Sequence, residues 1–165
     1  MNSALLIPAA EKALSLIFNG IDGQVKGNIR RVLEIYCRHR VGVRHFASVS
    51  GYGHDDLGRE TLDQVFAEIV GAEAAVVRVQ FVSGTHAIAC ALFGVLRPGD
   101  EMLSVVGAPY DTLEEVIGTR GSGQGSLKEF GISYRELALE SDGAIDWHTL
   151  SHTIQNHTRL VLIQR

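Results

Sequence analysis

Apolar positions follow a helical period in the first part of the chain. They recur on one stripe as Val25, Ile29, Val32, Leu33 and Tyr36, and on another as Leu62, Val65, Phe66 and Ile69. A recurrence every three or four residues is typical of an amphipathic helix. We therefore expect helices over residues 9–18, 25–40 and 62–69, with a glycine-rich polar loop over residues 48–59.

From residue 74 onward, short apolar runs alternate with segments of helical length. The runs expected to be strands are residues 74–81, 102–106, 132–137 and 160–163. The expected helices are residues 85–96, 111–117 and 146–154. This alternation indicates βαβ units, with a parallel sheet covered by helices on both faces. The sequence thus predicts an α/β fold in three layers, preceded by a helical N-terminal arm over residues 1–45.

Composition narrows the possible environments and partners of the chain. Its 165 residues are 45% hydrophobic and 21% charged, enough apolar material for a packed core. Acidic residues outnumber basic ones, 19 to 15, so no basic surface for nucleic acid is expected. We find no signal peptide and no apolar stretch approaching the ~20 residues of a membrane span. These features, with Cys37 and Cys90 expected as buried free thiols, predict a cytoplasmic protein.

A candidate phosphate site follows the first expected strand. That strand leads into a helix through Ser83, Gly84 and Thr85. Small residues there let the backbone N–H groups of the first helical turn approach an anion, and the helix dipole adds positive partial charge. The alternative is an N-cap serine and a glycine turn without a ligand. A nucleophile–base pair of Ser83 with His86 is a weaker alternative, because the sequence offers no acidic residue to orient the histidine.

Several strings, in the same order, resemble the fold-type-I pyridoxal-phosphate (PLP) enzymes. They are SGTHAI at 83–88, LRPGDEML at 96–103 and GAPYDTL at 107–113. Two more, GYGHDDLGRETL at 51–62 and GQGSLKEFG at 123–131, are similar to strings of the methionine gamma-lyase-like or cystathionine beta-lyase-like branch called aluminium resistance proteins. The resemblance implies that residues 46–165 are the first half of a PLP-binding large domain, and that the chain is truncated.

The resemblance also implies roles for particular residues. Gly84 and Thr85 match positions whose backbone N–H groups hold the cofactor phosphate, with Ser83 shaping the turn. Tyr110 matches the aromatic residue that stacks on the pyridine ring. Tyr52 resembles a loop tyrosine that reaches a neighbouring subunit's cofactor phosphate.

Two neighbours of Tyr52 leave a question open. The transsulfuration-type lyases usually place an arginine two residues after that tyrosine, whereas this chain has His54 there, and its nearest arginine is Arg59. Either residue is a candidate for phosphate binding. The alternative is a solvated loop with a capped helix start at Asp55 and Asp56.

The reaction implied by the resemblance is carbon–sulfur bond elimination from a small sulfur amino acid by a homo-oligomer, a dimer or tetramer. Such an enzyme needs a lysine that forms a Schiff base with the cofactor. The only lysines are Lys12, Lys26 and Lys128, and none lies where the resemblance places the Schiff-base lysine. We therefore expect that lysine beyond Arg165 and no catalytic residue within the chain. We also expect no activity of the chain alone. The alternatives are a non-catalytic module that binds PLP or another phosphate ester, and a different PLP reaction such as transamination.

Other groupings favour structural roles. The glycines at 121, 123 and 125 lack a preceding strand and the Gly-Lys-Ser/Thr ending of a P-loop, so a loop near the site is expected. His148 and His152 lie four residues apart on an expected helix, but without a third ligand nearby we expect a surface face and no metal site.

Overall fold

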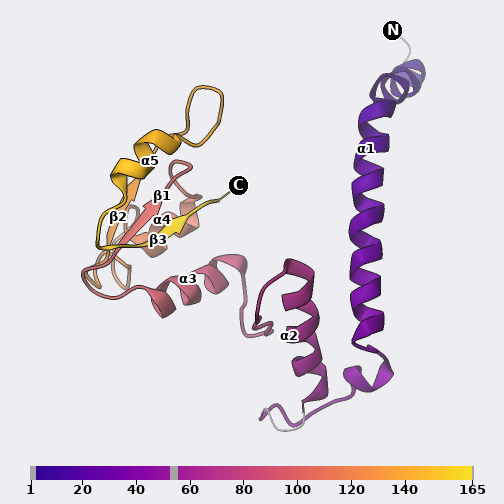
Figure 1. Ribbon diagram of the computed structural model, residues 1–165, viewed down its shortest axis with the longest axis horizontal. Coiled ribbons are helices and arrows are strands. Elements are labelled where there is room, and N and C mark those ends of the chain that lie inside the picture. Colours follow the sequence, from indigo (N-terminus) through magenta and orange to yellow (C-terminus); the bar gives the residue numbers. More distant parts are fainter. Residues whose placement is uncertain (1–2, 53–55, 165) are drawn as a thin grey trace. The chain divides into compact units, whose positions relative to one another are not determined.

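The computed structural model describes residues 3–52 and 56–164, and the chain divides into two compact units between Val79 and Gln80 (Figure 1). The first unit holds helix α1 (Ser3–Arg38), a short 3-10 helix η1 (Val43–Phe46) and helix α2 (Leu57–Val70). The two helices expected over residues 9–18 and 25–40 are one continuous α1 that ends at Arg38, because Gly20 and Gly23 lower helix stability without breaking the hydrogen-bond ladder. Within the described residues, no helix is long and apolar enough to cross a membrane.

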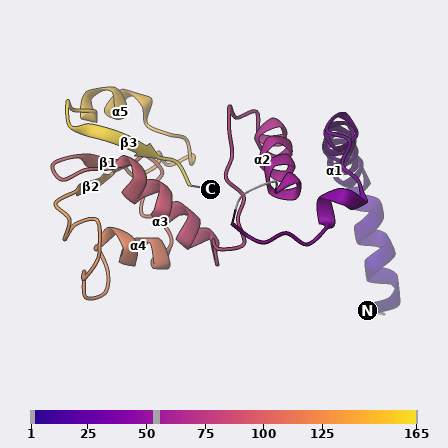
Figure 2. The same cartoon turned by 90° about the horizontal axis from the view of Figure 1, so that it is seen from below.

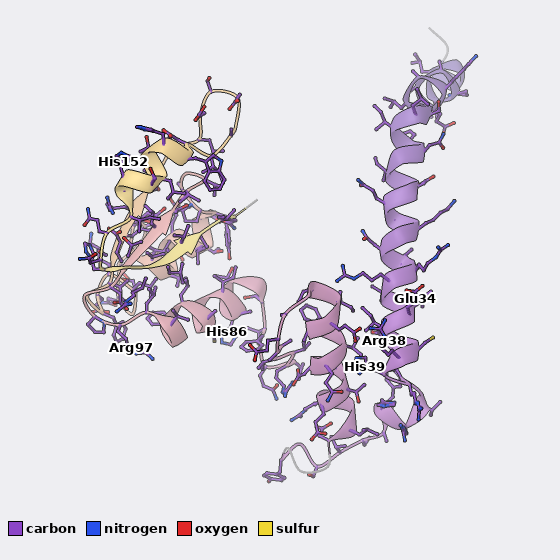
Figure 3. The ribbon with its side chains drawn as sticks, in the orientation of Figure 1. Glu34, Arg38, His39, His86, Arg97 and His152 are labelled. Carbon is purple, nitrogen blue, oxygen red and sulfur yellow. The ribbon has the colours of Figure 1, made fainter. Side chains whose placement is uncertain are left out.

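The C-terminal end of α1 packs on α2. Ile35 is buried there, and the guanidinium of Arg31 donates to the Glu68 carbonyl at 3.3 Å. The Glu68 carboxylate pairs with Arg38 and lies 2.7 Å from Nε2 of His39. Figure 3 shows Arg38 and His39 between the two helices. One carboxylate of α2 thus binds the last residue of α1 and the histidine that follows it.

Capping residues fix the ends of α2. The Asp56 side chain accepts a hydrogen bond from the Arg59 N–H at 3.1 Å, and Gly71 ends the helix in the left-handed conformation, φ +71°. Both are the residue types preferred at those positions. The helix expected over residues 62–69 is therefore confirmed, and it begins five residues earlier than the apolar stripe.

The prediction of a strand over residues 74–81 is wrong, because this segment forms neither a strand nor a helix. A strand needs a neighbour for its backbone groups, and none of the strands among residues 3–52 and 56–164 pairs with it. Asp63 of α2 holds the segment instead, accepting from the Val77 N–H at 2.7 Å and from Arg78 at 2.7 and 2.8 Å. The hydrogen bonds from Arg78 lower the pKa of Asp63 despite partial burial.

The second unit contains a parallel sheet. Its elements are α3 (Gly84–Val95), β1 (Glu101–Ser104), α4 (Asp111–Ile117), β2 (Ser133–Glu136), α5 (Trp147–Thr153) and β3 (Thr158–Leu162). The described strands are ordered β2-β1-β3, and β1 pairs in parallel with both neighbours. The other three expected strands and all three expected helices of this region are therefore confirmed, with shifts of one or two residues at their ends.

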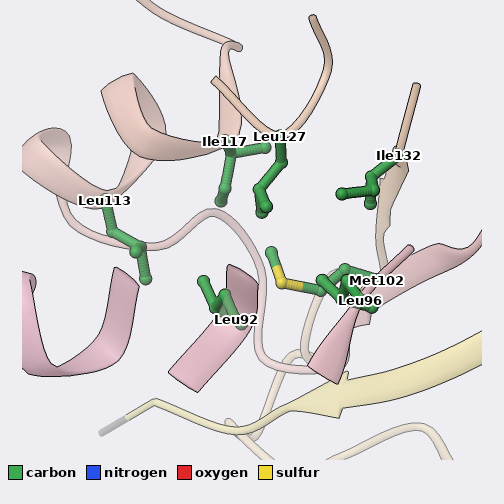
Figure 4. Packing of buried hydrophobic residues seen from close by; sticks show 7 residues of the cluster. All are labelled: Leu92, Leu96, Met102, Leu113, Ile117, Leu127 and Ile132. Carbon is green, nitrogen blue, oxygen red and sulfur yellow. The ribbon is translucent and has the colours of Figure 1, made fainter. Parts of the chain in front are cut away.

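Helices cover both faces of this sheet. In Figure 2, α5 lies on one side of the sheet and α3 and α4 lie on the other. Met102 and Leu103 of the central strand are fully buried on opposite faces, as the alternation of side chains along a strand requires. Met102 packs with Leu92, Leu96, Leu113, Ile117, Leu127 and Ile132 (Figure 4). Leu103 packs with Val105 and Leu150 of the α5 side, so the sheet has a core on each face.

The two cysteines correct another expectation. Cys37 and Cys90 are free thiols, as predicted, but both are exposed. Both cysteines lie among apolar residues of a helix, and the apolar periodicity therefore wrongly predicted that their side chains are buried.

Candidate functional site

The candidate site is built on the N-terminus of α3. Ser83 has an extended backbone, and its hydroxyl accepts a hydrogen bond from the His86 N–H at 3.1 Å, so the expected N-cap is present. No described residue accepts a hydrogen bond from the backbone N–H groups of Gly84 and Thr85. Because the cap occupies only one of the free N–H groups, the first turn still presents positive partial charge to an anion.

Gly84 is not required by the fold of the described chain. Its φ lies outside the left-handed region, and a Cβ built on it would meet no atom within 4 Å. The position is therefore an open cradle, where the lack of a side chain gives a ligand direct access to the backbone.

Three hydroxyl groups meet beside this cradle. The Thr85 Oγ1 atom lies 3.0 Å from the Tyr110 hydroxyl and 3.1 Å from the Thr112 Oγ1 atom. Tyr110 is the N-cap of α4, and its half-buried ring packs against the cluster around Met102. The structure thus brings together Thr85 and Tyr110, two site residues that lie 25 positions apart in the sequence.

The loop that carries Tyr110 is held at two points. Ser104, at the end of β1, donates to the Gly107 carbonyl at 2.6 Å, and Gly107 adopts φ +83°. The side chain of Gln164, just after β3, accepts from the Tyr110 N–H at 3.2 Å. The site therefore lies at the carboxyl ends of β1 and β3, where ligands bind in parallel α/β sheets.

Sequence reasoning missed Thr112 and Gln164. Thr112 follows Tyr110 by two residues inside one of the recognised strings, and Gln164 directly follows the last apolar run. Polar residues at the carboxyl end of an expected strand are the signal that could have identified Gln164.

Ser83 and His86 do not form a nucleophile–base pair. The Ser83 hydroxyl bonds the His86 backbone, and the Nδ1 atom of His86 accepts from the Val82 N–H at 3.3 Å. The His86 ring meets the edge of Phe81 at 5.8 Å. Both side chains stabilise the turn into α3.

The other predicted site residues belong to the first unit. Tyr52 is 85% exposed, and its role stays a prediction. His54 and Asp55 lie outside the described residues. Arg59 is engaged within its own unit, since its Nε atom lies 2.9 Å from Asp56 and its guanidinium donates to the Gly51 carbonyl at 3.4 Å.

Among the described residues, neither a lysine nor a cluster of metal-binding side chains lies at the candidate site. Lys128 follows the C-terminal end of α4, opposite the end where Tyr110 lies, and Lys12 and Lys26 belong to α1. His148 and His152 stack at 4.9 Å, and no group of three metal-binding side chains occurs in the described part of the chain. The glycines at 121, 123 and 125 form turns with positive φ after α4.

Comparisons with known proteins agree with one another. The family described as methionine gamma-lyase matches residues 3–165. YnbB of Bacillus subtilis strain 168, described as an uncharacterized protein, is 52% identical over 136 residues, which are 82% of this chain and 32% of YnbB. The chain therefore spans about a third of this curated relative.

Solved structures show the same likeness. A Listeria innocua protein, proposed to be a cystathionine beta-lyase involved in aluminum resistance, is 44% identical with a TM-score of 0.92, over 100% of this chain and 41% of that protein. A carbon–sulfur lyase involved in aluminum resistance from Clostridium novyi NT is 41% identical with a TM-score of 0.91, over 98% of this chain and 40% of that protein. With a family match over nearly its whole length, the chain belongs to the methionine gamma-lyase family.

Proposed function

We propose that this chain supplies the phosphate-binding and ring-stacking part of a fold-type-I, PLP-dependent carbon–sulfur lyase acting on sulfur amino acids. The observation that carries the proposal is the contact of Thr85 with Tyr110 beside the open N-terminus of α3. One residue is suited to a phosphate and the other to an aromatic ring, and PLP joins these two groups in one molecule.

The residues present fit this cofactor. The backbone N–H groups of Gly84 and Thr85 and the Thr85 hydroxyl would hold the phosphate, and the absence of a Cβ at residue 84 leaves room for it. Tyr110 would orient the pyridine ring, because its own ring is fixed by the core on one side and by Gln164 at its backbone. When bound, PLP supplies an electron sink that stabilises negative charge on an amino-acid substrate.

The work of these residues is binding and orientation. Fixing the phosphate end prevents drift of the ring, and fixing Tyr110 sets the plane in which the ring lies, which reduces the entropy lost when reacting groups align. A lyase reaction, ahead of transamination, is supported by the family and by the names of the similar structures.

Self-association and a cytoplasmic location belong to the same proposal. The large apolar side chains of Phe18, Ile21, Val25 and Ile29 on α1 are each about half exposed. A contiguous apolar stripe on a helix supports contact with another protein surface, and we propose a second copy of the chain. Sedimentation velocity over a concentration series tests this, and a monomer at all concentrations would exclude it.

The cofactor proposal is tested with pyridoxamine 5'-phosphate, which carries the phosphate and ring but no aldehyde that could react with surface lysines. We expect the chain to bind it more tightly than pyridoxamine, with inorganic phosphate as a competitor, in titration calorimetry. Equal affinity for the two compounds, or no binding of either, would refute the proposal.

A further inference from the structure

The three hydroxyls beside α3 share a limited number of protons. Thr85 lies between Tyr110 and Thr112, at 3.0 and 3.1 Å, and either partner of each pair can be the donor. Each hydroxyl carries one proton and two lone pairs. Thr85 can therefore donate to only one neighbour at a time, and the direction of the two hydrogen bonds depends on what else the Thr85 hydroxyl meets.

A phosphate ester would set that direction, because its oxygens act mainly as hydrogen-bond acceptors. The Thr85 hydroxyl favours such a group only when its proton points toward it, since a lone pair facing a phosphate oxygen is repelled. Both contacts to Thr85 must then use protons from Tyr110 and Thr112. Each of these residues has one hydroxyl proton, so both are committed to Thr85.

Resting on the proposed function, we infer that Thr112 is a positioning residue for the cofactor phosphate. It acts through Thr85, whose proton it directs toward the phosphate. The same network couples phosphate binding to the orientation of Tyr110, because the tyrosine hydroxyl becomes a fixed donor while Gln164 holds the tyrosine backbone. The phosphate group alone therefore restrains the ring against which the pyridine stacks.

Thr112 is a suitable position for a test because its side chain is exposed and lies outside the core. We expect Thr112→Val to weaken binding of pyridoxamine 5'-phosphate two- to tenfold, the range of one hydrogen bond, without changing the affinity for pyridoxamine. Thr112→Ser keeps the hydroxyl and should restore the wild-type affinity. Thr119→Val is the matched control, because the Thr119 hydroxyl bonds the Glu114 carbonyl at the far end of α4.

A second readout follows Tyr110 directly. In the full chain labelled with ¹³C at the tyrosine rings, inorganic phosphate should shift the Tyr110 signal, assigned by its loss in Tyr110→Phe, among the four tyrosines. The shift should be lost in Thr85→Val and reduced in Thr112→Val. Equal weakening of both ligands by Thr112→Val, no rescue by serine, or an unmoved Tyr110 signal would overturn the inference. A wild-type chain without preference for the phosphorylated ligand would refute the proposed function itself. A wild-type chain with that preference, combined with any of the three results above, would refute only the role of Thr112.

Discussion

Arg135 of β2 donates two hydrogen bonds to the buried carboxylate of Glu101 on β1, from Nε at 2.5 Å and from Nη2 at 2.8 Å. Glu101 also accepts from the Thr158 hydroxyl of β3 at 2.6 Å. One carboxylate therefore connects all three described strands near the amino end of β1, whereas the candidate site lies at the carboxyl ends of the strands. The bonds from Arg135 outweigh burial and lower the pKa of Glu101 from its ordinary 4.5 to about 2.

This pKa predicts an acid-sensitive second unit. A carboxyl whose pKa is lower in the folded state adds stability that is fully present above pH 4.5 and is lost as the pH falls toward 2. We expect the free energy of unfolding to decline over that interval, measured by urea denaturation with the fluorescence of Trp147, the only tryptophan. The decline should be smaller in Glu101→Gln, and an equal decline in that variant would contradict the assignment.

Removing only the arginine should be costly at neutral pH. Arg135→Met leaves Glu101 buried without its main partner, and we expect a loss of about 2–3 kcal/mol, below the usual range for a fully buried pair because Arg135 is 38% exposed. Arg159→Met is the matched control, since its partner distance is 3.6 Å and its side chain is 66% exposed. Comparable losses of stability in the two variants would show that the hydrogen bonds of Arg135 to Glu101 contribute no more than an exposed ion pair.

The core around Met102 should respond strongly to truncation. Leu113 of α4 is fully buried between α3 and the sheet, so Leu113→Ala should lower stability by about 2–5 kcal/mol. Leu139→Ala, at a position that is 38% exposed, should cost much less. Thermal unfolding followed by circular dichroism compares them, and similar melting temperatures for the two variants would argue against the packing in Figure 4.

A substitution of Gly84 should weaken ligand binding without lowering stability. A Cβ at this position meets no atom of the described chain, and alanine favours a helix, so Gly84→Ala should keep or slightly raise the melting temperature. The same change should weaken binding of pyridoxamine 5'-phosphate, because the methyl group occupies the open cradle. Gly94→Ala in the same helix also meets open space and serves as the control. Unchanged ligand affinity in Gly84→Ala would remove this residue from the site.

Asp63 should control the order of the segment that follows α2. Asp63→Ala removes the acceptor of both Val77 and Arg78, so backbone amides near residue 77 should exchange faster with deuterium. Asp63→Asn keeps one acceptor oxygen and should fall between the wild type and the alanine variant. Equal exchange in all three proteins would show that Asp63 does not hold this segment.

Local signals explain why much of the fold could be predicted. The Gly118 C-cap with φ +93° and the Asp146 N-cap, which accepts from the Thr149 N–H at 2.8 Å, act over a few residues and can be recognised without knowing the fold. The ends of α4 and α5 agree to within a residue with the helices expected over residues 111–117 and 146–154, which the sequence bounds by Gly118 and by the turn at Asp142 and Gly143. The alternation of short apolar runs with helical segments predicted that helices cover both faces of β1, because a strand buried on both faces is a short apolar run without alternating polar residues.

The rest depended on distant contacts. Residues 74–81 have the composition of a strand, but strand formation requires a partner for the backbone, and the described segment is bound to Asp63 instead. The exposed thiol of Cys90 depends on which face of α3 meets the sheet. Thr85 and Tyr110 were both expected at the site from the family resemblance and from the strand ends, whereas the contacts of Thr112 with Thr85 and of Gln164 with Tyr110 depend on packing.

The amino-acid sequence by itself determined most of the helices, the parallel α/β arrangement and the turn at Ser83 and Gly84, because each depends on interactions within a few residues or on a periodic apolar face. Only the tertiary structure decided which hydroxyls surround Thr85 and which carboxylate joins the three strands. Those contacts link residues 25 or more positions apart, and their partners are set by how the helices and strands pack together.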